Sequence, residues 1–152
     1  MRALYCIALA LLFTPTAPAA DYPCRILRVI DGDTLSAEVR QVITLFDGAR
    51  AVIGVERRIR LAGVNAPELH ASAACERVAA VQAREFVGAL VRGREERCVL
   101  RLGQAQHDKY GRLLGAVSID GTDIAGALIA SGQGREYAGG KRGAWLCAVS
   151  SD

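Results

Sequence analysis

A strand gives way to a turn within the stretch Arg60-Leu61-Ala62-Gly63-Val64-Asn65-Ala66-Pro67-Glu68. Proline cannot continue a sheet ladder, and it pushes the residue before it into an extended conformation. Arg60 therefore lies on the strand, and Glu68 lies just past its end. Arginine grips phosphate oxygens with a fork of donors, and a carboxylate can take a proton from water. The pair suits chemistry on a phosphate, although a surface arginine and a turn glutamate explain this stretch better when it is taken alone.

Alternating or β-branched apolar residues around this stretch predict five short strands. The predicted strands cover residues 25–30, 35–46, 51–62, 97–102 and 113–119. Asp-Gly pairs at 31–32, 47–48 and 120–121 are typical of turns between strands. An apolar stripe predicts a helix over 73–91, and Asp123 can cap a second helix over 124–131. Residues 103–111 are polar and predict a loop.

Five strands with a helix between the third and the fourth match the order of an OB-fold, a Greek-key barrel often used to bind oligonucleotides. The predicted fold class is therefore mainly β with two to three helices, in a five-stranded barrel. The hairpin between the second and third strands is long, and we expect its outer part, residues 43–53, to project beyond the body of the domain. A fold of this kind does not by itself define a function.

Residues 1–20 have the composition of a secretory signal peptide. Arg2 precedes an apolar run over 3–13 that is too short to cross a bilayer, and small residues follow it. We expect cleavage after Ala19 or Ala20, which leaves a single domain over 21–152 that is periplasmic or secreted, without a membrane anchor and monomeric. The chain has 51% hydrophobic and 23% charged residues and a net charge of +3, which is compatible with a polyanionic partner but does not establish one.

Four cysteines remain after the signal peptide, and an even number in an exported chain predicts two disulfides with three possible connectivities. A zinc site is disfavoured, because no two of these cysteines have the close spacing of metal ligands. Cys24 opens the first strand and Cys98 lies on the fourth, and these strands are neighbours in an OB barrel. We therefore predict Cys24–Cys98, which leaves Cys75–Cys147 as the second bridge.

Two further polar motifs accompany the opening stretch. Asp31-Gly32-Asp33-Thr34 is a turn signal that could also present Asp33 to a hard cation. An EF-hand is excluded, because no spaced series of oxygen ligands follows. The other motif is Asp108-Lys109-Tyr110-Gly111-Arg112. In this order, from about Cys24 to about Tyr137, the three motifs resemble the thermonuclease family, the staphylococcal-nuclease-like enzymes that depend on calcium.

The resemblance implies a Ca²⁺ site. Its ligands would be the side chains of Asp33 and Asn65 and the backbone carbonyl of Ala66, with Asp31 supporting them from behind. The family often has an aspartate where this chain has Asn65. An amide keeps the oxygen geometry but not the charge, so we hypothesise weak Ca²⁺ binding, toward the ~10⁻⁴–10⁻³ M range of extracellular modules. The alternative is that Asn65 is only a turn residue.

The resemblance also implies catalytic and nucleotide-binding residues. Arg60 and Arg112 match the arginines that hold the phosphate, and Glu68 matches the carboxylate that activates water. The positions that would contact the nucleotide are Lys109 and Tyr110, with Tyr137 aligned more loosely. The family's reaction is hydrolysis of the P–O5′ bond of DNA or RNA, which leaves 3′-phosphates. Two rivals remain: a non-catalytic OB-fold module that binds nucleic acid, and an exported interaction domain that keeps the site as a relic.

Overall fold

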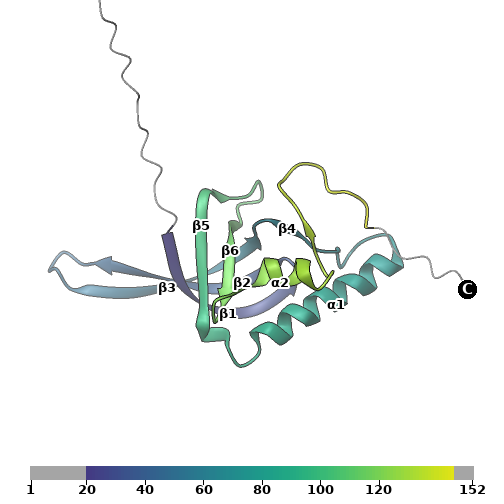
Figure 1. The fold of residues 1–152 in the computed structure, drawn as a ribbon. Coiled ribbons are helices and arrows are strands. Elements are labelled where there is room, and N and C mark those ends of the chain that lie inside the picture. The colour runs from purple at the N-terminus through teal and green to yellow at the C-terminus, as the bar shows by residue number, and fades with distance from the viewer. Residues whose placement is uncertain (1–19, 146–152) are drawn as a thin grey trace, which may run out of the picture.

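Five long strands form the body of the protein, whose computed structural model describes residues 20–145. These strands are β1 (Ala20–Asp31), β2 (Thr34–Thr44), β3 (Arg50–Leu61), β5 (Cys98–His107) and β6 (Leu113–Ile119). The sheet order is β3-β2-β1-β5-β6, and a parallel pairing of β3 with β6 closes it into a barrel. The predicted mainly-β fold with an OB-like barrel is therefore confirmed (Figure 1).

Shorter elements join and cover the barrel. They are β4 (Val64–Asn65), α1 (Ala74–Val91), the 3-10 turn η1 (Glu95–Arg97), β7 (Thr122–Asp123), α2 (Ile124–Ala130) and β8 (Arg135–Glu136). The Asp123 side chain accepts a hydrogen bond of 2.8 Å from the Gly126 amide, so it caps α2 as predicted. β4 pairs with β8, which brings the C-terminal part of the described chain back to the turn after β3. None of the helices described within residues 20–145 is long and apolar enough to cross a membrane.

Alternate residues of the strands fill the barrel. Leu35, Ile59, Leu100 and Val117 are each fully buried, as expected for the inward face of a closed sheet. α1 packs across one end of the barrel with a line of small side chains, Ala80, Ala83, Val87 and Val91. The helix passes so close to Gly32 that a Cβ at that residue would lie 2.8 Å from the Cβ of Ala83.

Strands β1 and β5 are both longer than predicted. β1 begins at Ala20, and its first residues pair with β5 in the register Ala20↔Leu102 to Cys24↔Cys98. β5 continues to His107, where a loop was expected from residue 103. The ladder with β6 shifts register after Leu102 and resumes at His107↔Leu113, so the strand continues although its apolar alternation has ended.

Cys24 and Cys98 face each other across the β1–β5 ladder and form a disulfide, the pairing that the sequence favoured. The second predicted bridge, Cys75–Cys147, includes a residue outside the described part of the chain and stays a prediction. The predicted signal peptide also lies outside the described residues, except for Ala20. The disulfide ties the first strand of the barrel to the fourth of its five long strands.

The outer part of the β2–β3 hairpin projects away from the barrel, as expected (Figure 1). β1 pairs with β2 only as far as Val39, and β6 pairs with β3 only from Ile59 to Leu61. Beyond Val39 on β2 and before Ile59 on β3, the two strands pair only with each other, without a break out to Thr44↔Arg50. The result is a two-stranded ribbon that no other described element covers.

Candidate active site

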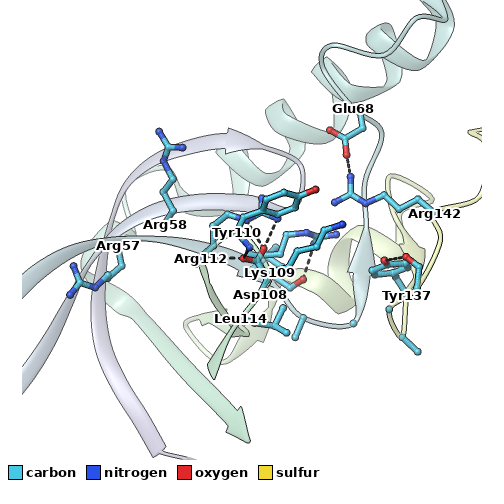
Figure 2. Close-up of a pocket in the computed structure, with 18 of the residues that line it drawn as sticks. Arg57, Arg58, Glu68, Asp108, Lys109, Tyr110, Arg112, Leu114, Tyr137 and Arg142 are labelled. Atoms are coloured by element: carbon cyan, nitrogen blue, oxygen red, sulfur yellow. Dashed lines mark hydrogen bonds and ion pairs between the residues drawn. The ribbon is translucent and has the colours of Figure 1, made fainter. Parts of the chain in front are cut away.

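A basic cavity of about 1480 Å³ lies where three distant parts of the chain meet (Figure 2). One wall is the end of β3 with the turn after it, the second is the β5–β6 turn, and the third is the segment 137–142. Its described lining holds seven basic and three acidic side chains, so the cavity suits an anionic ligand. The cavity brings together six of the residues predicted from sequence: Arg60, Glu68, Lys109, Tyr110, Arg112 and Tyr137.

Arg60 lies in the floor of this cavity and is only 4% exposed. Its Nη1 donates a 2.8 Å hydrogen bond to the backbone oxygen of Leu61, and its Nη2 lies 3.0 Å from Asp33 Oδ2. Burial lowers the pKa of Arg60, and Asp33 opposes that effect, but an arginine still stays protonated. Nη2 is itself buried, and although no hydrogen bond from it is well aligned within residues 20–145, it faces the Asp33 carboxylate in this ion pair.

Asp33, the first predicted metal ligand, lies behind Arg60 and does not line the cavity. Its Oδ2 accepts a hydrogen bond of 2.8 Å from the Ala66 amide, which joins two of the three predicted ligand positions. Its own amide donates to Asp31 Oδ1 at 3.0 Å, so Asp31 holds the turn in place. Burial raises the pKa of Asp33, and the Arg60 guanidinium and the Ala66 amide work against that rise.

Asn65 is the third predicted metal ligand, and its Oδ1 is buried without a hydrogen-bond partner among the described residues. A buried oxygen without a hydrogen-bond partner, in the residue before Ala66, is compatible with a role as a neutral cation ligand. The donor set is sparse, because residues 20–145 contain no group of three or more His, Cys, Asp or Glu side chains that could hold a metal. A cation here would have Asp33 as its one charged ligand, although that carboxylate already contacts Arg60 and the Ala66 amide, and two neutral oxygens from Asn65 and Ala66.

Arg112 is held toward the cavity by Asp108, a residue that the sequence analysis quoted without a role. Both Nε and Nη2 of Arg112 lie 2.7 Å from Asp108 Oδ2. Asp108 Oδ1 accepts from the amides of Tyr110 and Arg112, at 2.9 and 3.0 Å. Burial works to raise the pKa of Asp108, but these hydrogen bonds from Arg112 and Tyr110 hold it below its ordinary value. The turn therefore fixes the guanidinium, whose Nη1 also donates to Thr34 Oγ1 at 3.3 Å.

Glu68 points into the cavity from the turn after β4 and forms an ion pair with Arg142 (Figure 2). Arg142 was missed by the sequence analysis, and the only signal for it was the Lys141-Arg142 pair after two glycines. Its segment is held in place by a hydrogen bond of 3.0 Å from the Tyr137 amide to the Gly63 oxygen. Both side chains of the ion pair stay accessible, at 50% for Glu68 and 37% for Arg142.

The rim of the cavity carries the predicted nucleotide-contacting residues. Tyr110 is 70% exposed, and Lys109 Nζ lies 5.0 Å from the centre of its ring. Tyr137 lies on the opposite wall, with its hydroxyl donating to the Gly140 oxygen at 2.6 Å. An exposed aromatic ring beside a cation offers a surface on which a base can stack next to its phosphate.

These features define a class: an OB-like barrel whose basic cavity combines two arginines with a carboxylate. Residues 58–143 match the family described as staphylococcal nuclease homologue, and the chain belongs to that family. The match covers the cavity lining except Glu56 and Arg57, and it begins after Asp33. No curated protein matches the chain.

Proposed function

We propose that this protein is a Ca²⁺-dependent nuclease that hydrolyses phosphodiester bonds of DNA or RNA. The observation that carries the proposal is that Arg60, Arg112 and Glu68, far apart in the sequence, line one basic cavity in a member of a nuclease family. The Arg60 guanidinium lines the cavity and is held in a fixed position by Asp33, which supports a role as a preorganised positive charge toward phosphate. The cleaved bond would be P–O5′, which leaves a 3′-phosphate.

In the proposed mechanism the two arginines bind the scissile phosphate, and their charge stabilises the additional negative charge of the five-coordinate transition state. Glu68 takes a proton from the attacking water as the new bond to phosphorus forms. The P–O5′ bond breaks, and the leaving oxygen takes a proton from solvent. When bound, calcium would supply further positive charge at the phosphate oxygens, held by Asp33, Asn65 and the carbonyl of Ala66.

The ion pair between Glu68 and Arg142 bears on this mechanism. A carboxylate that is engaged by a guanidinium is a weaker proton acceptor than a free one. A substrate phosphate entering the cavity offers Arg142 a competing anion, because Arg142 lines the same cavity. The proposal is therefore that substrate draws Arg142 away from Glu68 and frees the base.

We also propose that the protein is exported, to the periplasm or the medium, and acts as a monomer. The Cys24–Cys98 disulfide supports export, because disulfides persist mainly in oxidising compartments. Calcium reaches the concentrations of a weak site chiefly outside the cytosol. The predicted signal peptide points to the same compartment.

The test is cleavage of plasmid DNA and of RNA by the purified protein, with Ca²⁺ or with EDTA. Glu68→Gln should reduce the rate by ~10²–10⁴-fold, and Arg112→Ala by ~10²–10³-fold. Glu85→Gln on the exposed face of α1 is the matched control and should cleave like the wild type. If both site variants cleave normally, the assigned roles are wrong; binding without cleavage by the wild type would favour the non-catalytic module.

A further inference from the structure

The projecting end of the β2–β3 hairpin is the most exposed apolar feature of the described protein. Phe46 at its tip is 107% exposed, and Val52 and Val42 are 67% and 56% exposed. Facing residues of paired strands share a side of the ribbon, so Val42↔Val52 lies on one side and Ile43↔Ala51 on the other. An apolar surface on both sides of an uncovered ribbon marks a binding site, because monomers rarely leave such surface in water.

The charges on the ribbon identify the partner. Arg57 and Arg58 stand at its base and line the cavity, and Arg50 stands at its far end. None of these three arginines forms an ion pair within residues 20–145. The acidic neighbours are already engaged: Glu56 accepts from the Ser36 hydroxyl at 2.6 Å, and Asp47 accepts from the Ala49 amide at 2.9 Å. Unpaired cations therefore stand at both ends of the ribbon, and those at its base belong to the positive cavity.

We propose that the hairpin is an arm that lies along a groove of double-stranded nucleic acid, beside the strand held in the cavity. This inference rests on the proposed function. The groove of duplex DNA admits a two-stranded β-ribbon, and apolar tips of such elements enter between base steps. From Val39 to Thr44 the arm extends roughly 17 Å, at about 3.3 Å per residue, so it reaches well beyond the cavity. Leu45 and Phe46 would contact bases, and the arginines would contact phosphates.

Two other occupants fit this surface less well. A second copy of the chain could pair with the open edge of β3, but that would bring two rows of unpaired arginines together. A lipid surface would accept the apolar tip and Arg50, but it would leave Arg57 and Arg58, which line the cavity at the base of the arm, without a partner. A nucleic acid satisfies both parts of the arm, because it offers phosphates along its length and apolar base faces between them.

The experiment measures binding of a 30-base-pair DNA duplex in an inactive Glu68→Gln background, by fluorescence anisotropy over a range of salt concentrations. The double variant Phe46→Ala with Arg50→Ala should weaken duplex binding by about tenfold and reduce the slope of log affinity against log salt by about one. Val78→Ala, at another exposed valine, on α1, is the control and should bind as the parent does. When Glu68 is present, the double variant should cleave a dinucleotide at the rate of the wild type, because so short a substrate does not reach the arm.

Other outcomes would contradict the proposal that the hairpin binds duplex nucleic acid. Unchanged duplex affinity in the double variant refutes it, and so does an equal loss of affinity for a single strand of the same length. Phe46-dependent binding to vesicles of anionic phospholipid, or a dimer in sedimentation that the double variant abolishes, assigns the surface to a membrane or to a second copy. If the parent protein binds no nucleic acid, the proposed function itself is refuted. If the parent and the double variant bind the duplex equally well, only the role of the hairpin as an arm is refuted.

Discussion

Gly32→Ala is expected to destabilise the protein and disturb its site, although Gly32 does not adopt a positive φ and its backbone would accept alanine. Gly32 lies between two carboxylates and is wedged between the turn after β4 and helix α1. An added Cβ would lie 2.7 Å from the Cβ of Ala66 and 2.8 Å from the Cβ of Ala83. Both neighbours are fixed to the backbone, so neither can rotate away.

The size of the effect follows from these distances. Restoring an ordinary contact of 3.4 Å requires shifts of 0.7 Å and 0.6 Å at the two neighbours. Overpacking of this kind costs about 1–3 kcal/mol. Alanine also restricts the unfolded chain, which offsets about 0.4–1 kcal/mol of that cost. We therefore expect a net loss of about 1–2 kcal/mol in the free energy of unfolding. Because Ala66 would move with the shift, Ca²⁺ activation should also need more calcium.

Urea unfolding followed by circular dichroism measures the first effect, and cleavage against Ca²⁺ concentration measures the second. Gly88→Ala is the matched control, because Gly88 is helical and nothing lies within 4 Å of an added Cβ. That change should stabilise α1 by about 0.5–1 kcal/mol. A Gly32→Ala protein as stable as the wild type, or a Gly88→Ala protein that loses as much, would show that the contact with α1 is not tight.

Three further predictions concern the site and the barrel. Asn65→Asp should move half-saturation to lower Ca²⁺, and an unchanged titration curve with intact activity would mean that residue 65 does not touch the metal. Asp108→Asn should release Arg112 and lower kcat more than substrate affinity. The lowered pKa of Asp108 means that its ionised form stabilises the fold above its ordinary value of 3.8, and that this contribution is lost as the pH falls below it. The variant's unfolding free energy should therefore fall less in acid, and an equally steep fall would contradict this. Cys24→Ser should cost about 2–4 kcal/mol of stability, measured by urea unfolding without reductant, and a loss under 1 kcal/mol would count against the bridge as a constraint.

Apolar alternation predicted the order of the long strands, and it placed β6 at its observed bounds, Leu113–Ile119. It failed for the end of β5, where a register shift carries the strand past its apolar alternation to His107, which pairs with Leu113. The apolar stripe expected on α1 was Ala79, Ala83, Phe86, Val87 and Leu90. Ala83 and Val87 are buried and Phe86 packs against the core, but Ala80 and Val91, outside that stripe, are buried as well. Small side chains let the helix approach the barrel closely, and hydrophobic size alone does not reveal that approach.

Short motifs predicted most of the cavity, because each one sits where a strand ends at a turn and the strand order brings the turns together. They did not predict Arg142, whose position depends on the pairing of β4 with β8 and on the contact between Tyr137 and Gly63. Those contacts join residues 70 or more positions apart. Local sequence carries no sign of which loop such a segment will cross. The contact between Asp33 and Arg60 was likewise not foreseen from either motif.

The segments that form the three walls of the cavity are also synthesised at different times. Residues that form the barrel strands, up to Ile119, are made before the segment that carries Tyr137 and Arg142. A nascent chain can therefore close its barrel while one side of the cavity is still missing. Synthesis must pass residue 142 before the cavity has all its charges, so a hydrolytic site of this design would acquire its full form only late in the making of the chain.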